Sequence, residues 1–377
     1  MSHSDFPIGE YEERIKRIQR KLYEKGLDAL ILTSAETINY ATGYACSWTV
    51  CLGEFSCAIV FKDSEPALLV RSLESKSVKR HWMRDCSAYD DWRGPWSHLK
   101  DTLQKHKASQ GRIGVEENTL TLRKLESLRQ AVPGAELFGA ADIVPDLMCT
   151  PSPLEIEFTK RSARIAQAGF DRAIGMVREG MPFNRIITEA RQAMYSAGMT
   201  EQQMAEGNYI LCAVWGGVDG GRLHETDVTG QVEAGDLVTI ELWGTHKHYF
   251  SGAMGTVYVG MEPPSTIVDT YAVISDMYLR TREALAPGAR SSEVWENANK
   301  PYKASYGVDY FRMIGFRQGA ALTGRLDRGT DVMKPGMTYI VQPEVTDPLF
   351  ICVCATLMIT ETGCEELTKP LLELVRV

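Results

Sequence analysis

The stretch that most constrains the fold of this chain covers residues 211–260. A glycine-rich loop that carries His224 is followed by a turn at residues 233–236 and by an apolar run at 237–240, which predicts a buried strand. Glu241 comes directly after that run. A carboxylate is costly to bury unless it is paired, so Glu241 is a candidate functional residue. The alternative is that it ends the strand and faces water.

Composition narrows the class of protein. The chain has 377 residues, of which 44% are apolar and 24% charged, as in soluble globular proteins of two domains. The net charge of −8 argues against a nucleic-acid partner, and no apolar run is long enough to span a bilayer. Nine scattered cysteines predict reduced thiols and a cytoplasmic location. We therefore expect a small-molecule substrate, with no nucleic acid and no membrane.

Residues 1–150 are predicted to form an α/β domain. Strands at 28–33, 58–61, 67–70 and 113–116 alternate with helices at 11–25, 96–107 and 120–131. No catalytic set is evident here. His81, His98 and His106 lie in polar context and are predicted to be surface residues.

Residues 151–377 are predicted to form an α+β domain that begins where Pro-Ser-Pro interrupts the pattern at 151–153. Helices are expected at 155–179, 184–197, 264–286 and 291–306, the last broken or kinked near Pro301. Strands are expected at 337–342 and 351–360, in one antiparallel sheet with the strand before Glu241. Residues 315–319 read as a loop.

Several segments together resemble the creatinase/prolidase/methionine-aminopeptidase (M24) superfamily. They are the helix at 154–169, the Gly-Asp pair at 235–236 with its strand, Pro-Gly-Met at 335–337 and the segment 360–368. The likeness covers nearly the whole chain. It implies a creatinase-like N-terminal domain and a pita-bread fold for the second domain.

The resemblance also implies where metal ligands would lie, because the family's peptidases hold two metal ions through Asp, Asp, His, Glu and Glu. These five places fall on Glu241, Gly252, Phe316, Gln342 and Cys354. Only the first keeps an ionisable oxygen ligand, and hard divalent ions require several carboxylates or imidazoles. We therefore expect neither a metal nor another cofactor, whereas the histidine that the family keeps outside the metal shell is retained as His224.

Loss of the metal set with retention of this histidine resembles the creatinase and ectoine hydrolase branch. Glu241-Leu-Trp-Gly with the following Lys-His-Tyr, and the segment 313–319, are similar to ectoine hydrolase. Creatinase's guanidinium-binding glutamates fall on Met254 and Gln342, so creatinase activity itself is not expected. The resemblance implies a metal-independent hydrolase that cleaves a C–N bond, amide or amidine, of a small nitrogen-rich solute.

Such a reaction needs an activated water and a proton for the leaving nitrogen. We expect His224 to act as base and then acid, because imidazole titrates near neutrality, and Glu241 to orient the substrate or attack it. Substrate contacts are expected from the positions at which the family's ligands and neighbouring segments fall: Trp243, His246, His248, Tyr249, Phe316, Arg317, Gln342, Glu344 and Cys354.

The residues leave three alternatives to a metal-independent hydrolase open. His246 and His248, alternating on a strand end, could join Cys352, Cys354 and His224 in a single soft-metal site, although the spacing matches no zinc pattern. The protein could be a metallopeptidase of the Xaa-Pro aminopeptidase or dipeptidase type with altered ligands. It could also be a peptide-binding module without catalysis.

A homodimer with composite active sites is the remaining expectation. In the resembled enzymes the small domain of one subunit closes the partner's site. The segment 45–54 places an aromatic and an acidic residue in a glycine-flanked loop, which makes Trp48 and Glu54 the candidates for reaching across.

Overall fold

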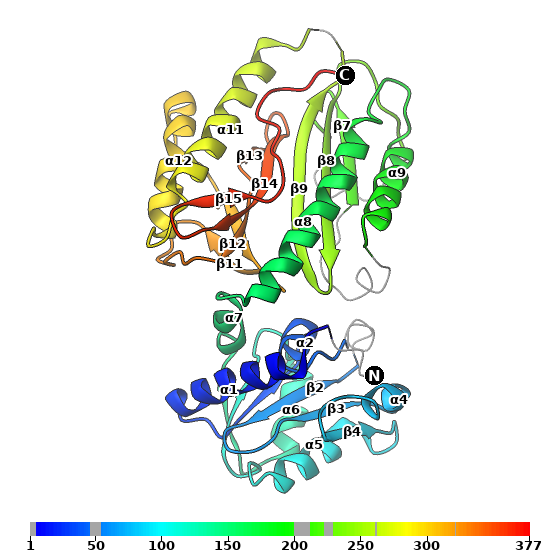
Figure 1. The fold of residues 1–377 in the computed structure, drawn as a ribbon, viewed down its shortest axis with the longest axis vertical. Helices are drawn as coiled ribbons and strands as arrows, with labels where there is room; N and C mark the ends of the chain where they lie inside the picture. Colours follow the sequence, from blue (N-terminus) through cyan, green and yellow to red (C-terminus); the bar gives the residue numbers. More distant parts are fainter. Residues whose placement is uncertain (1–4, 46–53, 200–211, 222–228, 261, 321) are drawn as a thin grey trace. The chain divides into compact units, whose positions relative to one another are not determined.

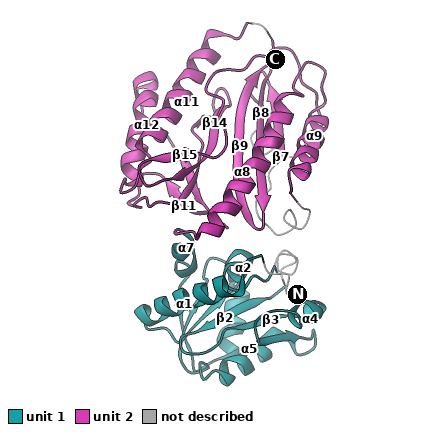
Figure 2. Ribbon diagram, viewed as in Figure 1, with its two compact units in different colours: residues 1–148, 205–207 teal, residues 149–204, 208–377 magenta. Residues whose placement is uncertain are grey.

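The computed structural model describes residues 5–45, 54–199, 212–221, 229–260, 262–320 and 322–377. These residues divide into two compact units, 5–148 and 149–377, which Figure 2 distinguishes by colour. No helix among the described residues has both the length and the apolar character that a membrane span requires.

The first unit is built on a six-stranded sheet in the order β4-β3-β2-β1-β5-β6. The antiparallel pairs β1–β2 and β2–β3 lie between the parallel pairs β3–β4, β1–β5 and β5–β6. Helices alternate with these strands along the chain, so the α/β prediction for this region is confirmed. The strands are β1 (Ala29–Leu32), β2 (Cys57–Phe61), β3 (Ala67–Arg71), β4 (Asp85–Tyr89), β5 (Arg112–Val115) and β6 (Glu136–Gly139). The helices are α1 (Ile8–Lys25), α2 (Ala35–Thr42), α4 (Ser75–Val78), α5 (Gly94–Lys105), α6 (Leu122–Ala131) and α7 (Ile143–Met148), with a 3-10 turn at Ser72–Glu74.

The second unit is an antiparallel sheet covered by helices, as the pita-bread fold requires. Its main path runs β11-β10-β12-β14-β9-β8-β7, and β13 and β15 pair with β14. The strands are β7 (Cys212–Gly217), β8 (Leu237–His246), β9 (Tyr249–Tyr258), β10 (Gly315–Gln318), β11 (Leu322–Leu326), β12 (Thr338–Val341), β13 (Glu344–Val345), β14 (Ile351–Ile359) and β15 (Cys364–Glu366). The helices are α8 (Pro153–Ile174), α9 (Phe183–Ser196), α11 (Ser265–Ala284) and α12 (Ser291–Tyr306).

Helix α8 lies against β8 and β9 (Figure 1). Its start is fixed by a capping box: the Glu155 amide donates to the Ser152 hydroxyl, and the Ser152 amide donates to the Glu155 carboxylate. Gly244 on β8 permits the close approach, because a Cβ there would lie 2.3 Å from the backbone nitrogen of Ala166. This packing assigns one face of β8 to the helix and leaves the other face for the site described below.

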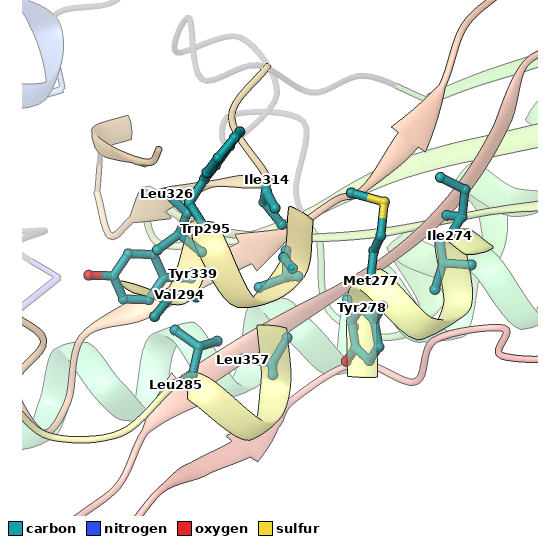
Figure 3. Close-up of a cluster of buried hydrophobic side chains, with 14 of the residues drawn as sticks. Ile274, Met277, Tyr278, Leu285, Val294, Trp295, Ile314, Leu326, Tyr339 and Leu357 are labelled. Atoms are coloured by element: carbon teal, nitrogen blue, oxygen red, sulfur yellow. The ribbon is translucent and has the colours of Figure 1, made fainter. Parts of the chain in front are cut away.

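Helices α11 and α12 cover the other part of the sheet. Figure 3 shows Ile274, Met277 and Tyr278 of α11, with Val294 and Trp295 of α12, packed in one apolar cluster with strand residues. The cluster includes Tyr339 and Leu357, which lie opposite each other on β12 and β14. This core holds β12 and β14 in place from the side that faces the helices.

One local prediction is wrong, and a second is settled in part. Residues 315–319, read as a loop, include strand β10, which pairs with both β11 and β12. Its short, glycine-flanked sequence has no alternating pattern, and only the neighbouring strands define it. Helix α12 runs through Pro301 without the break that was one of the two outcomes expected there, and Pro301 is buried. Packing against α11 supports the helix across that position.

Candidate active site

Glu241 lies on the face of the sheet that α8 does not cover. The register places Ala213, Glu241, Met254 and Cys354 side by side across β7, β8, β9 and β14. A buried cluster surrounds Glu241, and we call this surface the Glu241 face; it comprises Ala213, Trp215, Trp243, Phe250, Met254, Ile340, Phe350, Cys352 and Cys354. The carboxyl group of Glu241 is therefore set in a wall of aromatic rings and thioether or thiol sulfur.

The environment of Glu241 is unusual for a carboxylate. Its side chain is 4% exposed, and Oε1 accepts a hydrogen bond of 2.7 Å from Nε1 of Trp243. Oε2 has no hydrogen-bond partner among the described residues. Burial raises the pKa of the Glu241 carboxyl to about 7; the charge of Glu344 adds to the rise, whereas the Trp243 hydrogen bond and the charge of Arg312 oppose it. Near neutral pH this group can therefore hold or release a proton.

A second carboxylate, Glu344, is fully buried close to Glu241. One carboxylate oxygen accepts an ion-paired hydrogen bond from Arg312, and the other accepts from Nε2 of Gln342 at 2.9 Å. The hydroxyl of Tyr310 fixes the backbone on both sides, donating to the Glu344 carbonyl and accepting from its amide. Glu344 is thus ion-paired with Arg312, whereas Oε1 of Glu241 accepts from the neutral indole of Trp243.

The two cysteines on the Glu241 face are buried and uncharged. Burial, with the charges of Glu241 and Glu344, raises the pKa of both the Cys352 and the Cys354 thiols. A thiol binds metal as the thiolate, so this environment disfavours coordination. The cysteines instead pack as small apolar groups between the aromatic rings.

Among the described residues, the soft-metal grouping predicted from the sequence does not assemble. His246 points to the opposite face, where its ring contacts Phe158 of α8 at a centroid distance of 5.4 Å. His248 does not share that face, because Lys247 and His248 have φ of 50° and 69° and form the two-residue turn between β8 and β9. The expected alternation of His246 and His248 along a strand is therefore wrong.

Two further predicted substrate contacts also lie away from the Glu241 face. The hydroxyl of Tyr249 donates a hydrogen bond of 2.6 Å to Glu155 at the start of α8. The guanidinium group of Arg317 is bound to Asp331 at 2.9 Å and to the Thr323 carbonyl at 3.0 Å. Arg317 pairs with Tyr339, whose ring packs in the cluster under α11 and α12. Both residues stabilise the fold at these positions and do not join Glu241.

Phe316 alternates with Arg317 on β10 and pairs with Ile340, a member of the Glu241 face. Of the predicted substrate contacts, Trp243 and Cys354 lie on the Glu241 face, and Glu344, which accepts from Gln342, lies close to Glu241. Phe316 is linked to this face through its strand partner Ile340. Glu54 lies in the other unit, where its carboxylate accepts from Arg71 at 3.1 Å. Trp48 and His224 lie outside the described residues.

The start of the glycine-rich loop, residues 218–221, lies against Phe350 of the Glu241 face. The carbonyl of Asp219 accepts from the amide of Phe350 at 2.7 Å. Gly220 has a φ of 91°, and a Cβ there would lie 2.6 Å from the Phe350 carbonyl, so only glycine fits this approach. The segment that leads to His224 therefore starts beside an aromatic residue of the Glu241 face.

The residues of this site that were not predicted include Trp215, Tyr310, Arg312 and Phe350. Trp215 could have been found from alternation with Ala213 on a strand next to Glu241. Arg312 and Phe350 carry no local signal, because each reaches the site from a loop distant in sequence.

The side chains at the family's five ligand positions do not fit a pair of metal ions. Gly252 offers no donor, Phe316 is aromatic, Gln342 is a neutral amide and Cys354 is a buried thiol of raised pKa. Within the described ranges, no three His, Cys, Asp or Glu side chains are arranged to hold a metal. The donor set is therefore unlike the oxygen-rich set that hard divalent ions require.

Comparison with known proteins places both units. Residues 14–147 match the Creatinase/Prolidase N-terminal domain, and residues 157–361 match Metallopeptidase family M24. Relatives include the creatinase of Bacillus sp. (strain B-0618), 23% identical over 97% of this chain and 92% of the relative. The Xaa-Pro dipeptidase of Lactobacillus delbrueckii subsp. lactis is 24% identical (89% and 90% covered), and the ectoine hydrolase of Halomonas elongata is 22% identical (96% of both).

Among solved structures, a prolidase from Thermococcus sibiricus has a TM-score of 0.86 at 16% identity, covering 97% of this chain and 99% of that one. This likeness shows the fold alone. With a family match over more than half of its length, the chain belongs to metallopeptidase family M24 and is a two-domain enzyme of the creatinase/prolidase superfamily.

Proposed function

We propose that the chain is a metal-independent hydrolase that cleaves an amide or amidine C–N bond of a small, nitrogen-rich solute. The observation that carries this proposal is Glu241, a buried carboxyl group at the family's first metal position with its Oε2 unpartnered among the described residues. Leaving a buried acceptor unpaired is costly, so the site favours a ligand that supplies an N–H donor.

The surroundings support a substrate that is planar and cationic or polar at nitrogen. An amidine or amide N–H can donate to Oε2 of Glu241, and an amidinium gains a charge-assisted bond. Trp215, Trp243 and Phe350 offer aromatic faces suited to a flat cation. Glu344, which binds Arg312 and Gln342, adds negative charge close to Glu241.

The proposed chemistry divides between two residues. His224 removes a proton from the attacking water and later donates it to the leaving nitrogen. Glu241 holds the substrate nitrogen in place, or attacks the substrate carbon as a nucleophile. The negatively charged intermediate requires hydrogen-bond donors near the reacting carbon.

The experiment is a substrate screen on purified protein, with amidines and with cyclic and N-acyl amino acids, read by mass change. Metal content is measured on the same sample, and each reaction is repeated after chelation. Turnover that survives chelation and is lost in Glu241→Gln supports the proposal. Stoichiometric Zn, Mn, Fe or Co whose removal abolishes hydrolysis of Xaa-Pro dipeptides would instead establish the peptidase alternative, which similarity to dipeptidases favours. Binding of peptides without turnover would establish the non-catalytic alternative.

We also propose a homodimer in which Trp48 and Glu54 of one subunit reach the partner's site. Native mass spectrometry measures the number of subunits. Mixing the inactive Glu241→Gln protein with the inactive Glu54→Ala protein tests whether each active site takes residues from both subunits. Recovered activity in the mixture supports a composite site. A fully active monomer would rule it out.

A further inference from the structure

A row of three hydrogen-bonded side chains in the first unit has the composition of a nucleophilic centre. The hydroxyl of Ser64 lies 2.7 Å from Nδ1 of His106, and Nε2 of the same ring lies 2.6 Å from Oδ2 of Asp85. The prediction that His106 is a surface residue is wrong, because its side chain is 11% exposed. Serine, imidazole and carboxylate in this order form an arrangement that can activate a hydroxyl.

Three separate elements bring the row together. Ser64 lies in the turn between β2 and β3, His106 follows the end of α5, and Asp85 begins β4. The ring of His106 stacks on Phe61 at a centroid distance of 4.0 Å and an angle of 8°. Stacking and two hydrogen bonds together fix the plane of the imidazole.

Ser64 and His106 both open onto a pocket of about 460 Å³, while Asp85 lies behind the ring and does not line it. The pocket is bounded by Asp28, Phe61, Lys62, Asp63, Ser64, Lys105, His106, Lys107 and Ala108. Lys62 is paired with Asp28 at 2.7 Å, and Lys105 with Asp85 at 2.9 Å. Lys107 is exposed at the rim with a φ of 60°, and no ion pair of Lys107 occurs within the described residues.

The charges set the direction of the hydrogen bonds. Burial works against ionisation of Asp85, but the hydrogen bonds from His106 and Lys105 outweigh it and hold the pKa of Asp85 below its ordinary value. An ionised Asp85 accepts a hydrogen bond from Nε2–H, which leaves Nδ1 as an acceptor for the Ser64 hydroxyl. Ser64 is thereby hydrogen-bonded to a base.

We propose that Ser64, His106 and Asp85 form a second hydrolytic centre, in which Ser64 attacks small carboxylic esters. Ser64 Oγ forms a bond to the ester carbonyl carbon while its proton passes to Nδ1 of His106. The bond from that carbon to the leaving oxygen breaks, and the alcohol departs with the proton. Water then attacks the acyl-Ser64 with the same base, releasing the carboxylic acid and restoring the hydroxyl.

The pocket limits the substrate class. Its volume suits a small acyl group, and Lys107, which lines the pocket, is the cation that we expect to stabilise the developing oxyanion. An exposed lysine stabilises such a charge less than buried backbone donors do. The centre therefore suits esters with good leaving groups rather than amides.

The test uses two samples of the full-length protein, one treated with a fluorophosphonate probe and the other with 4-nitrophenyl acetate. Peptide mass spectrometry locates the label, which distinguishes this centre from any reaction at the Glu241 face. We expect one label per chain, on Ser64, and an initial burst of one equivalent of nitrophenol. Labelling spread over lysines or over several serines would overturn the proposal.

Variants separate reactivity from a purely structural network. Ser64→Ala removes the label, and His106→Gln slows labelling at least about 100-fold. Lys107→Met slows it roughly tenfold, less than loss of a buried donor. His98→Gln on α5 and the exposed Ser77→Ala are matched controls that leave the rate unchanged. Labelling of Ser64 that is unaffected by His106→Gln would show a merely accessible serine and refute the mechanism.

Asp85 acts through His106 and is a positioning residue, so its test requires a readout other than stability. Asp85→Asn should slow labelling by at least about tenfold and change its pH dependence, whereas Asp85→Glu should recover part of the rate. An unchanged pH profile in a folded Asp85→Asn protein would contradict the assignment.

Discussion

Trp243 donates a hydrogen bond of 2.7 Å from its indole nitrogen to Oε1 of Glu241, two residues earlier on the same face of β8. The bond stabilises the charged carboxylate and opposes the rise in the pKa of Glu241 that burial causes. The strand thus carries both the acid and the group that tunes it, and this pairing can be tested directly.

Trp243→Phe keeps an aromatic ring and removes the donor. We expect the pKa of Glu241 to move above about 7, so that a reaction requiring the carboxylate shifts its acidic limb to higher pH. The pH profile of kcat/KM measures the shift. Trp215→Phe, on the same face, is the control and should leave the limb in place. An unshifted profile in Trp243→Phe would mean that Glu241 does not titrate in the reaction.

Glu241→Gln should change how stability depends on pH. The folded-state pKa of about 7 is raised from an ordinary value of 4.5, so the protein binds the Glu241 proton more tightly when folded. The associated stability is fully present below about pH 4.5 and is lost as pH rises through about 7, by roughly 3 kcal/mol. Urea denaturation at pH 5 and pH 8 should show this loss in the wild type and not in Glu241→Gln. The exposed Glu283→Gln is the control, and equal losses in all three proteins would contradict the burial argument.

Arg312→Met should destabilise the second unit by roughly 3–5 kcal/mol, because it removes the ion pair that Arg312 makes with the fully buried Glu344. The double variant Arg312→Met/Glu344→Gln should recover most of that loss, since it removes both charges. Chemical denaturation measures each change. Arg280→Met removes an exposed ion pair with Asp276 and should cost less than about 1 kcal/mol. A double variant as unstable as Arg312→Met would show that packing, not charge, is responsible.

Two glycines of the β8–β9 hairpin should respond differently to alanine. A Cβ at Gly244 meets the α8 backbone at Ala166 N, 2.3 Å away, and at Ser162 O, 2.4 Å away, whereas at Gly252 the nearest atom is the side-chain end of Ile340 at 3.3 Å. Gly244→Ala should cost roughly 3 kcal/mol, and Gly252→Ala less than about 1 kcal/mol. Thermal unfolding of the two variants compares them directly. Similar melting temperatures would mean that α8 does not approach β8 as described.

Much of the fold follows from sequence because apolar runs and helix signals are local. The strand before Glu241 and the capped start of α8 are of this kind. The turn at Lys247–His248 was not predictable, since turns with two positive φ values usually carry Asn-Gly, and a Lys-His pair gives no such signal. Because this turn was missed, His246 and His248 were expected to share one strand face, whereas the register turns His246, together with Tyr249, toward α8.

The site itself could be predicted only in part. Glu241 was evident because a carboxylate after a buried strand is rare, and Gln342 and Glu344 followed from the family's ligand positions. Arg312 and Phe350 could not be predicted, because their contacts with Glu344 and Asp219 join residues far apart in sequence. Long-range pairing of this kind depends on the assembled sheet.

The last prediction concerns His224. If it transfers protons, His224→Ala should lower kcat by about 10²–10⁴, with a smaller effect on KM and little on stability. Combining it with Glu241→Gln should be little worse than the more damaging single change, because groups that act on one transition state are not additive. His248→Asn is the matched control: asparagine tolerates the positive φ of the hairpin turn, and this histidine lies outside the Glu241 face. The measurement is kcat/KM of the four variants on the substrate that the screen identifies. Near-native values for both His224→Ala and Glu241→Gln would place the reacting centre elsewhere, since no hydrolysis routed through this face could survive losing both its base and its carboxylate.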